Sequence, residues 1–451
     1  SGNYTRVFSQ SIVNELRGGF NKQRLFVHAP RTLSDFLSSI GFSSSDITAY
    51  GDITGAAALD TFGQTELRIT NFATISNGGR SVDRRLDQEL MTFGDTLTWV
   101  TGGHSIKGGY DGVRNRAIDG FTANRGNPRG RVDYTGSNLD PFARFLMGQP
   151  GNSANYVQKL RGALDASNWE HGFFVMDDWK IRPNLTLNLG LRYELITPFI
   201  EKDDLLVNFD PNTNSPNGRR GRFVVPTADV IPFIDPAMVA YGVVTADEAG
   251  VTRGLINTDK NNFAPRLGIA WRLNEGTVVR GGYGLFYPTS AAQGIRDAFG
   301  PTPFNQGRRR RTRGGLSLGG WPGGSTPPGQ VPINGGSIDP ASTVPSANLI
   351  PFDLQAPRIQ QYNATVEREL GWNTGLRVSY LGSRLNGLIG GVDLNLLHPS
   401  DTPFGNLNED GNPCVPDDFD CVITDADRAR LPFPDLGTFL LSYGNFGTGR
   451  S

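Results

Sequence analysis

Between Asn184 and Leu195 the chain reads NLTLNLGLRYEL, in which apolar residues alternate with polar residues or glycine. Side chains of an extended chain point alternately to its two faces, so the pattern predicts a β-strand with one apolar face. At about 3.3 Å per residue the strand would be roughly 40 Å long, whereas strands of globular proteins usually have about 5–6 residues. This length suits a bilayer, although a long strand of a β-sandwich would show the same alternation.

Similar alternating segments recur along the chain in pairs, and each pair is joined by a very short turn. The predicted pairs are 89–100 with 104–113, 171–181 with 184–195, 263–273 with 279–287, and 362–370 with 376–380. A fifth pair, 3–9 with 12–20, has a weaker pattern. Because strands joined by a short turn pair antiparallel, the sequence predicts an all-β protein built from antiparallel hairpins.

Long connections separate these hairpins, at about 114–168, 197–262, 288–357 and 385–437. Connections in compact soluble domains are usually about 4–6 residues long. Outer-membrane barrels combine short periplasmic turns with long extracellular loops, and this alternation therefore predicts an antiparallel transmembrane β-barrel. Within the outer loops, TLSDFLSSIGF (32–42) and IDPAMVAYG (234–242) are expected to form short helices.

Composition is compatible with such a barrel and excludes other classes. Lys and Arg number 43 against 44 Asp and Glu, a net charge of −1, which argues against a protein dedicated to nucleic acid. The mean hydropathy is −0.33, and no uninterrupted apolar run approaches the length of a membrane-spanning helix. A membrane barrel remains possible because only half of each strand is apolar.

Tryptophan placement gives a second indication of a membrane. Four of the six tryptophans lie beside or within the short turns of four hairpins: Trp99, Trp179, Trp271 and Trp372. Barrels carry aromatic girdles at the lipid–water interface, and these residues are predicted to form one. Each could instead cap a soluble core at a sheet end, but four equivalent positions favour the girdle.

On the strand predicted at 184–195, the side chains expected to face lipid are Leu185, Leu187, Leu189, Leu191, Tyr193 and Leu195. On its other face, Asn188, Arg192 and Glu194 are expected to line a polar lumen. An arginine at position 189 is then expected to impair membrane assembly.

Three charged residues interrupt the predicted apolar faces: Asp95, Asp177 and Arg368. Each lies within a few residues of a short turn, where the group could reach the lipid headgroups at little cost. A local β-bulge, which would turn the side chain to the other face, is the alternative explanation.

No motif of catalysis is present in the sequence. The four histidines, at 28, 104, 171 and 398, are scattered, and there is no HExxH, GxSxG or GxxxxGK[ST] motif. Paired acids such as Asp177–Asp178 are common in solvated loops and do not identify a catalytic pair. We therefore expect neither an enzyme nor a cofactor.

The connection 385–437 carries two features that could bind or cross-link. The two cysteines, Cys414 and Cys421, favour a loop disulfide, with free thiols as the alternative; a metal site is disfavoured without nearby histidine. The same stretch places four oxygen-bearing side chains in loose calcium-loop spacing: Asn406, Asn408, Asp410 and Asp417. That match is poor because Asn begins it, Asp replaces the closing Glu and Pro413 interrupts it.

A run of arginines, Arg308, Arg309, Arg310, Arg311 and Arg313, lies in a Gly- and Pro-rich connection. The simple interpretation is a solvated, partly disordered tract. The alternative is contact with phosphates of lipopolysaccharide or with an anionic ligand, because arginine forks bind such groups well.

Several phrases resemble one known family when taken in order. They are SIVNELRGGF, HSIKGGYDGVRNR, DPFARFLMGQP, FFVMDDWKIRPNLTLNLGLRYE, NNFAPRLGIAWRL, TVVRGGYGLFY, and RIQQYNATVEREL with VSYLGSR. Together they resemble the barrel of TonB-dependent outer-membrane receptors, specifically the Oar-like group of acidobacteria and myxobacteria. The resemblance covers essentially the whole chain and implies a barrel of about 22 strands with a plug, in the outer membrane of a Gram-negative, acidobacterial cell. It also implies uptake energised by TonB–ExbB–ExbD, and some Oar-like members are implicated in protein export.

Parts of that family pattern have no counterpart in the sequence, namely the signal peptide, regulatory N-terminal domain, plug and C-terminal strands. Residues 1–451 are thus expected to be a portion of the barrel domain. The expected function is uptake or passage of an unidentified large or scarce ligand. A passive porin or surface-adhesion barrel is the alternative, and a secreted carbohydrate-binding β-sandwich is a third. The resemblance identifies no ligand-binding residue, because the matching motifs are barrel strands.

Overall fold

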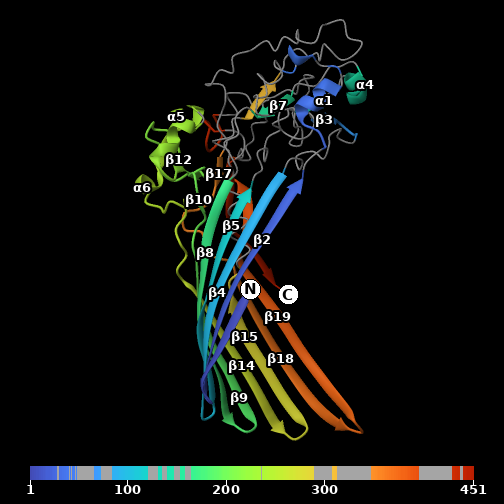
Figure 1. Ribbon diagram of the computed structural model, residues 1–451, viewed down its shortest axis with the longest axis vertical. Helices are drawn as coiled ribbons and strands as arrows, with labels where there is room; N and C mark the ends of the chain where they lie inside the picture. The colour runs from blue at the N-terminus through green and yellow to red at the C-terminus, as the bar shows by residue number, and fades with distance from the viewer. Residues whose placement is uncertain are drawn as a thin grey trace.

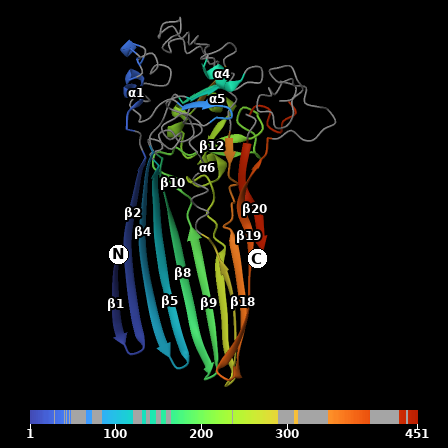
Figure 2. The same ribbon diagram turned by 90° about the vertical axis from the view of Figure 1, so that its right-hand side faces the viewer.

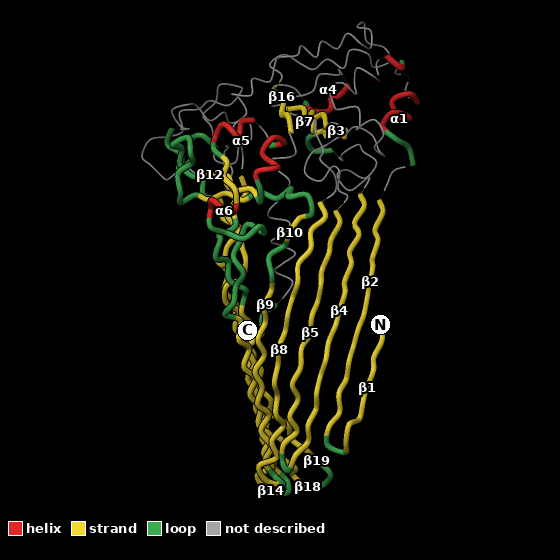
Figure 3. The backbone as a smooth tube through the Cα atoms, turned by 60° about the vertical axis from the view of Figure 1, so that its left-hand side comes forward, coloured by secondary structure: helices red, strands yellow, loops and turns green. Residues whose placement is uncertain are grey.

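The computed structural model describes residues 1–27, 30–39, 41, 43–45, 47, 66–72, 84–119, 131–134, 140–146, 153–157, 164–234, 236–288, 307–311, 347–395, 429–436 and 440–450. Long strands dominate these residues and stand side by side in one curved sheet (Figure 1). Short turns join the strands at one end of the sheet, and the strand ends that lead into the long connections lie at the other (Figure 3). We name these the turn end and the loop end.

The strands of this sheet follow one another in chain order, interrupted only by β17 at one edge and by β10 beside β8. Their bounds are β1 (Gly2–Ser9), β2 (Ile12–Val27), β4 (Arg84–Thr101), β5 (His104–Asp119), β8 (Leu164–Arg182), β9 (Leu185–Ile196), β14 (Asn262–Asn274), β15 (Thr277–Phe286), β18 (Arg358–Gly371), β19 (Thr374–Asp393) and β20 (Leu440–Arg450). The short strands are β10 (Ile200–Glu201) and β17 (Ala347–Leu349). All pairings are antiparallel except that of β17 with β20.

The predicted hairpins are confirmed, including the weaker fifth one formed by β1 and β2. Two of their turns contain residues with positive φ. Gly102 has φ of 56° in the β4–β5 turn, while Trp372 and Asn373 have φ of 49° and 56° in the β18–β19 turn. In the β18–β19 turn φ is positive at both central residues, which matches the right-handed twist of the paired strands.

The sheet is open within the described residues: β1 pairs only with β2, and β17 pairs only with β20. Figure 2 shows the chain ends on opposite edges of it, with β1 at one side and β20 at the other. No helix in the described part of the chain is long and apolar enough to cross a membrane.

The connection 197–262 folds into a small module. It contains a sheet and several helices, whereas the sequence predicted a loop with one short helix. Its three-stranded sheet contains β11 (Asn208–Asp210), β12 (Arg222–Val225) and β13 (Val243–Thr245). Around it lie η2 (Ala228–Phe233), α5 (Pro236–Tyr241) and α6 (Ala246–Ala249). The predicted helix at 234–242 is therefore confirmed as α5.

Distant segments complete the core of this module. Leu349 and Ile350 from one connection and Phe433 and Leu436 from another are buried among its side chains. We define the loop module as residues 203–256 together with 347–354 and 429–436. It sits at the loop end of the sheet (Figure 1).

A second small sheet at the loop end has the order β16 (Gly307–Arg311), β7 (Ser153–Val157), β6 (Arg131–Tyr134) and β3 (Glu66–Ile69). Beside it lies α4 (Pro141–Leu146), which packs Phe145 edge-on against Tyr134 at 5.3 Å. The predicted helix at 32–42 is confirmed as α1 (Leu33–Ser39). Thr32 begins this helix, because its hydroxyl accepts a hydrogen bond from the Asp35 amide at 3.1 Å.

Candidate functional site

The two faces of the long sheet differ in chemistry. Register places Leu191 of β9 between Val175 of β8 and Pro265 of β14, and all three point to the same face. Large apolar side chains that are more than a third exposed gather on this face: Leu16, Phe20, Met91, Phe93, Leu97, Trp99, Phe173, Val175, Leu189, Leu191, Leu267, Ile269, Trp271, Val366, Leu376, Val378 and Tyr380. An apolar surface of this extent needs an apolar environment. We call it the outer face.

The residues predicted to face lipid share this outer face. On β9 they are Leu185, Leu187, Leu189, Leu191, Tyr193 and Leu195. The four predicted girdle tryptophans all lie at the turn end of the sheet. Trp179 stacks on His104 at 5.1 Å, and Trp372 projects from its turn with 98% of its surface exposed.

Two acids on the outer face have cross-strand partners that the sequence did not suggest. Asp95 accepts a hydrogen bond from the Asn14 amide at 2.5 Å. Asp177 lies 2.6 Å from Nδ1 of His104. These contacts explain how both carboxylates are accommodated near the turn end without a bulge at either position. Arg368 is exposed and lies opposite Leu376 and Thr277, close to the turn.

The opposite face of the sheet, which we call the inner face, carries a chain of ion pairs. Arg192 of β9 donates from Nε to Glu194 at 2.7 Å and from Nη1 to Asp111 at 2.9 Å. Asp111 is also 3.4 Å from the Arg17 guanidinium. Gly172 provides the room, because a Cβ there would lie 2.1 Å from Nη2 of Arg192. Arg192 and Glu194 thus occupy the polar face, as the alternation predicted.

A test of this network is the Arg192→Met variant. Within the described residues, Arg192 supplies the one side-chain hydrogen bond that Glu194 receives. Losing it should lower the free energy of unfolding by about 1–3 kcal/mol, the cost of an unsatisfied, largely buried polar group. Denaturant unfolding in lipid vesicles, followed by tryptophan fluorescence, measures this change. The matched Arg182→Met variant, at an exposed position of the turn end, should stay within about 0.5 kcal/mol, and equal losses would contradict the assignment.

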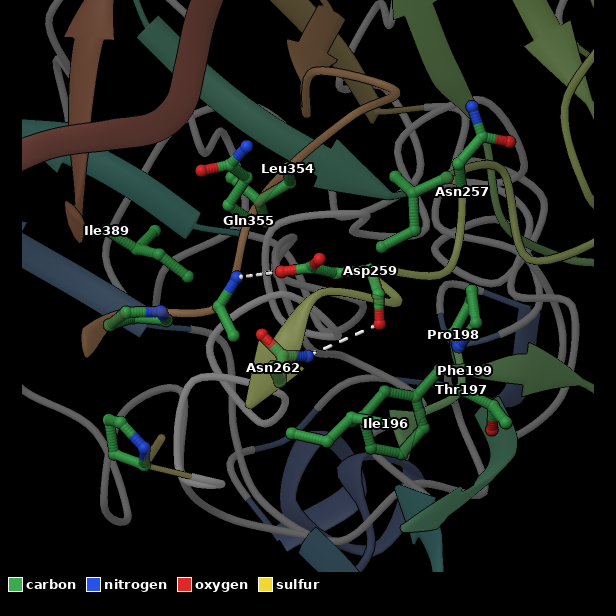
Figure 4. A pocket seen from close by; sticks show the side chains of 14 residues that line it. Ile196, Thr197, Pro198, Phe199, Asn257, Asp259, Asn262, Leu354, Gln355 and Ile389 are labelled. Carbon is green, nitrogen blue, oxygen red and sulfur yellow. Dashed lines mark hydrogen bonds between the residues drawn. The ribbon is translucent and has the colours of Figure 1, made fainter. Parts of the chain in front are cut away.

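At the loop end, where β9 ends and β14 begins, the sheet and its connections enclose a pocket. The mouth pocket is lined by Ile196, Thr197, Pro198, Phe199, Ile256, Asn257, Asp259, Asn262, Pro288, Leu354, Gln355, Ala356, Pro357 and Ile389 (Figure 4). Its cavity offers about 60 Å³ to the centre of a water-sized sphere and is partly open to solvent. Most of its lining is apolar, so its few polar groups determine what it can bind.

Asn262 is the most deeply buried of these polar groups, with 1% of its surface exposed. Its Nδ2 donates to the Asp259 carbonyl at 3.3 Å, whereas its Oδ1 has no hydrogen-bond partner in the described part of the chain. The Asp259 carboxylate is already used, since it accepts from the Ala356 amide at 2.9 Å (Figure 4). The Asn262 side chain thus lines the pocket, while its Oδ1 is enclosed by the surrounding protein.

Two buried side chains hold the backbone around this pocket. Asn208 donates from Nδ2 to the Leu255 and Ile350 carbonyls, at 3.0 and 2.8 Å. Its Oδ1 accepts from the Phe209 and Ile350 amides, at 2.8 and 2.9 Å. One amide thereby joins three segments of the chain. This role was not predictable from the sequence, because an asparagine in a loop is usually a turn residue.

Like Asn208, Glu201 holds backbone segments together, in this case where β10 pairs with β8. Its carboxylate is 1% exposed and accepts hydrogen bonds from the Asp165, Asp203 and Leu205 amides, at 3.0, 2.8 and 2.8 Å. Burial raises the pKa of this carboxyl group above its usual range, and the three backbone donors oppose that rise.

Several predicted features lie wholly or partly outside the described residues. They include the cysteines Cys414 and Cys421 and the calcium-loop candidates Asn406, Asn408, Asp410 and Asp417. Arg313 is also outside them, while the backbone of Arg308, Arg309, Arg310 and Arg311 lies in β16 and pairs with β7. In the described segments, no three His, Cys, Asp or Glu side chains come together as metal ligands.

Comparison with solved structures finds outer-membrane transporters and receptors. YddB of Escherichia coli has a TM-score of 0.41 at 11% identity, the ferric-catecholate import receptor Fiu of E. coli K12 has 0.35 at 10%, and the siderophore receptor PirA of Acinetobacter baumannii has 0.35 at 8%. The match covers 99%, 86% and 99% of this chain and 43%, 40% and 40% of those chains. The chain thus spans less than half the length of these structures.

No curated protein matches the sequence. A family model described as outer membrane beta barrel domain matches residues 1–446. This range contains every hairpin of the long sheet, with its apolar outer face and its ion-paired inner face. The chain therefore belongs to the outer membrane β-barrel domain family.

Proposed function

We propose that this chain is the barrel portion of a TonB-dependent outer-membrane transporter that takes up, or passes outward, a large or scarce ligand. The observation that carries the proposal is the inner face of the sheet. It presents the Arg17–Asp111–Arg192–Glu194 ion pairs along a wall, and the mouth pocket opens at the loop end of the same wall. A polar wall below a pocket suits a ligand that is first captured and then moved along a lumen.

We also propose that the chain is part of a larger, energised receptor. Residues 1–451 would supply about half of a barrel of about 22 strands, whose plug, signal peptide and regulatory domain belong to other parts of the protein. Energy would come from TonB–ExbB–ExbD. The phrases quoted from the sequence support an Oar-like receptor of an acidobacterial outer membrane.

The proposal also assigns parts of the chain to the lipid and to its two boundaries. The outer face would meet the hydrocarbon region, with the four tryptophans at its periplasmic boundary. The arginines of 308–313 would contact lipopolysaccharide phosphates on the outer surface. The loop disulfide and the calcium loop stay predictions from the sequence.

The test compares cells that carry the complete gene with cells that lack it. Mass spectrometry of the growth medium should find at least one solute or secreted polypeptide whose level depends on the gene. Deleting TonB should abolish that difference, because passage through the barrel would be energised. A difference that survives without TonB would indicate a passive porin, and no difference at all would indicate an adhesion barrel; either outcome overturns the proposal.

A further inference from the structure

A row of ion pairs crosses the outer face near the loop end of β2, β4, β5 and β8. Lys22 donates to Glu89 at 2.5 Å, and Arg116 donates to the other oxygen of Glu89 at 3.1 Å. Arg116 also donates to both oxygens of Asp165, at 2.8 and 2.6 Å. We call these four residues the charged row. The strand registers place them on the same face as the large apolar side chains, because positions two apart on a strand share a face.

A second line crosses the same four strands directly beside the charged row, on its turn-end side. Register pairs Phe20 with Met91, Met91 with Arg114, and Arg114 with Trp169. The two aromatic side chains and the methionine are all more than a third exposed. The apolar outer face therefore ends at this line, and Arg114 lies within it.

The separation from the turn-end tryptophans places this line at the edge of the hydrocarbon region. Trp169 and Trp179 lie on the same face of β8, ten positions apart. At about 3.3 Å per residue and a strand tilt of about 40°, ten residues span about 25 Å across the membrane. The apolar band of outer-membrane barrels is also about 25 Å tall. Lipid headgroups are therefore expected at the level of Arg114, and the loop end places them in the outer leaflet.

Arg114 is a cation without an acidic partner. Its side chain is exposed and makes no hydrogen bond or ion pair within the described part of the chain. The acid diagonally opposite on β4 is Glu89, and both of its oxygens are already bonded within the charged row. Both oxygens of Asp165 are likewise bonded to Arg116. The guanidinium of Arg114 is thus free to bind an anion from outside the protein.

The other charges near this level balance one another. The charged row is neutral, with two cations and two acids, and Arg24 lies 3.8 Å from its direct cross-strand partner Asp87. Lys202 and Asp203, in the segment after β10, add one charge of each sign. Glu170 points to the inner face, where it accepts a hydrogen bond from an asparagine. Among the described side chains one positive charge is left over, and it attracts an anion.

An aromatic block on the turn-end side of Arg114 indicates that the anion carries hydrocarbon. Trp169 stacks on His171 with ring centres 5.8 Å apart, and Phe173 packs against Tyr110 at 5.0 Å. The Tyr110 hydroxyl lies 2.8 Å from Nδ1 of His171, so these two polar atoms are paired with each other. We define the aromatic block as these four rings. A free phosphate ion would gain nothing from them, whereas a lipid buries its acyl chains against them.

We propose that Arg114 binds the phosphate of an outer-leaflet glycolipid, as carried by lipopolysaccharide, whose acyl chains pack on the aromatic block. The planar guanidinium can donate to two phosphate oxygens at once. A phosphate monoester also carries more than one negative charge at neutral pH, which favours it over the diester of a phospholipid. The inference rests on the proposed function only in that the outer face meets lipid. Lipid binding requires neither TonB nor a transported ligand, so failure of one proposal is distinguishable from failure of the other.

The experiment measures lipid binding to the complete protein, purified in a neutral detergent, by native mass spectrometry. The probes are lipid A with its phosphates, the same lipid with its phosphates removed, and phosphatidylglycerol. Phosphorylated lipid A should bind about fivefold more tightly than the dephosphorylated lipid, and phosphatidylglycerol should bind more weakly than phosphorylated lipid A. Equal binding of the two forms of lipid A would overturn the proposal. Equal binding of phosphatidylglycerol and phosphorylated lipid A would overturn the choice of a glycolipid.

The Arg114→Met variant locates the site, because it removes the charge and places an apolar side chain at the edge of an apolar face. It should weaken phosphorylated lipid A about fivefold and leave the dephosphorylated lipid unchanged. The matched Arg182→Met variant makes the same change at an exposed position of the turn end and should have no effect. Heat-dependent gel mobility checks that both variants are folded. Unchanged binding of phosphorylated lipid A in folded Arg114→Met would contradict the assignment, and so would an equal loss in Arg182→Met.

Discussion

The Asn208→Ala variant is expected to unfold the loop module while leaving the barrel strands assembled. Asn208 is completely buried and bonds to the backbone of Leu255, Ile350 and Phe209. The alanine leaves two carbonyls and two amides of these residues without their partner. At about 1–3 kcal/mol for a buried unsatisfied group, we expect a loss of about 3–5 kcal/mol in the local stability of the module, because water will reach some of these groups.

Amide exchange followed by mass spectrometry measures this effect segment by segment. Exchange should accelerate by two to three orders of magnitude, which corresponds to about 3–4 kcal/mol, in peptides covering 205–256. Peptides from β8 and β9 serve as the internal reference and should not change. The matched variant Asn214→Ala removes an exposed asparagine of the same module and should exchange like the unmodified protein. If both variants behave alike, the linking role of Asn208 is wrong.

The second large effect is expected from Leu191→Arg on the outer face. Leu191 is 45% exposed and has Val175 and Pro265 as cross-strand neighbours, so a new cation would have no acid opposite it. Near the middle of the bilayer an arginine on the lipid face costs about 2–4 kcal/mol. Assembly into lipid vesicles, followed by heat-dependent gel mobility, should fall accordingly, and normal assembly would contradict a lipid-facing outer face.

Leu189→Arg should cost less than Leu191→Arg, although both positions share the outer face. The difference is that Leu189 lies directly opposite Asp177, to which the arginine could pair. Asn188→Arg gives the control, because Asn188 points to the inner face and already bonds to Asp178 at 2.5 Å. It should assemble normally. The order of the three variants therefore tests the assignment of both faces of one strand.

Much of the fold was predictable because alternation is a local property. Each residue of NLTLNLGLRYEL shows by its own polarity which face it occupies, and each short turn brings the next strand alongside. The hairpins, the two faces of β9 and the turn-end tryptophans all follow from segments of fewer than about thirty residues. The helices α1 and α5 were predictable for the same reason.

The folded structure of the connections was less predictable because it depends on contacts with distant residues. Leu349 and Phe433 enter the core of the loop module from segments more than a hundred and nearly two hundred residues after the module's own β13. Asp95 and Asp177 interrupt the apolar face in the sequence. In the structure Asn14 and His104 lie beside them as hydrogen-bond partners. Polarity along the chain carries no information about such partners.

The sequence by itself determined that this chain forms long antiparallel hairpins with one apolar and one polar face. The reason is that apolar and polar residues alternate along each strand. Only the tertiary structure decided which polar residues meet. Glu194 and Asn262 are 68 positions apart, and the register between β9 and β14 makes them direct partners beside the mouth pocket. A shift of one residue would turn every side chain of β14 to the other face, so this pairing is a property of the register.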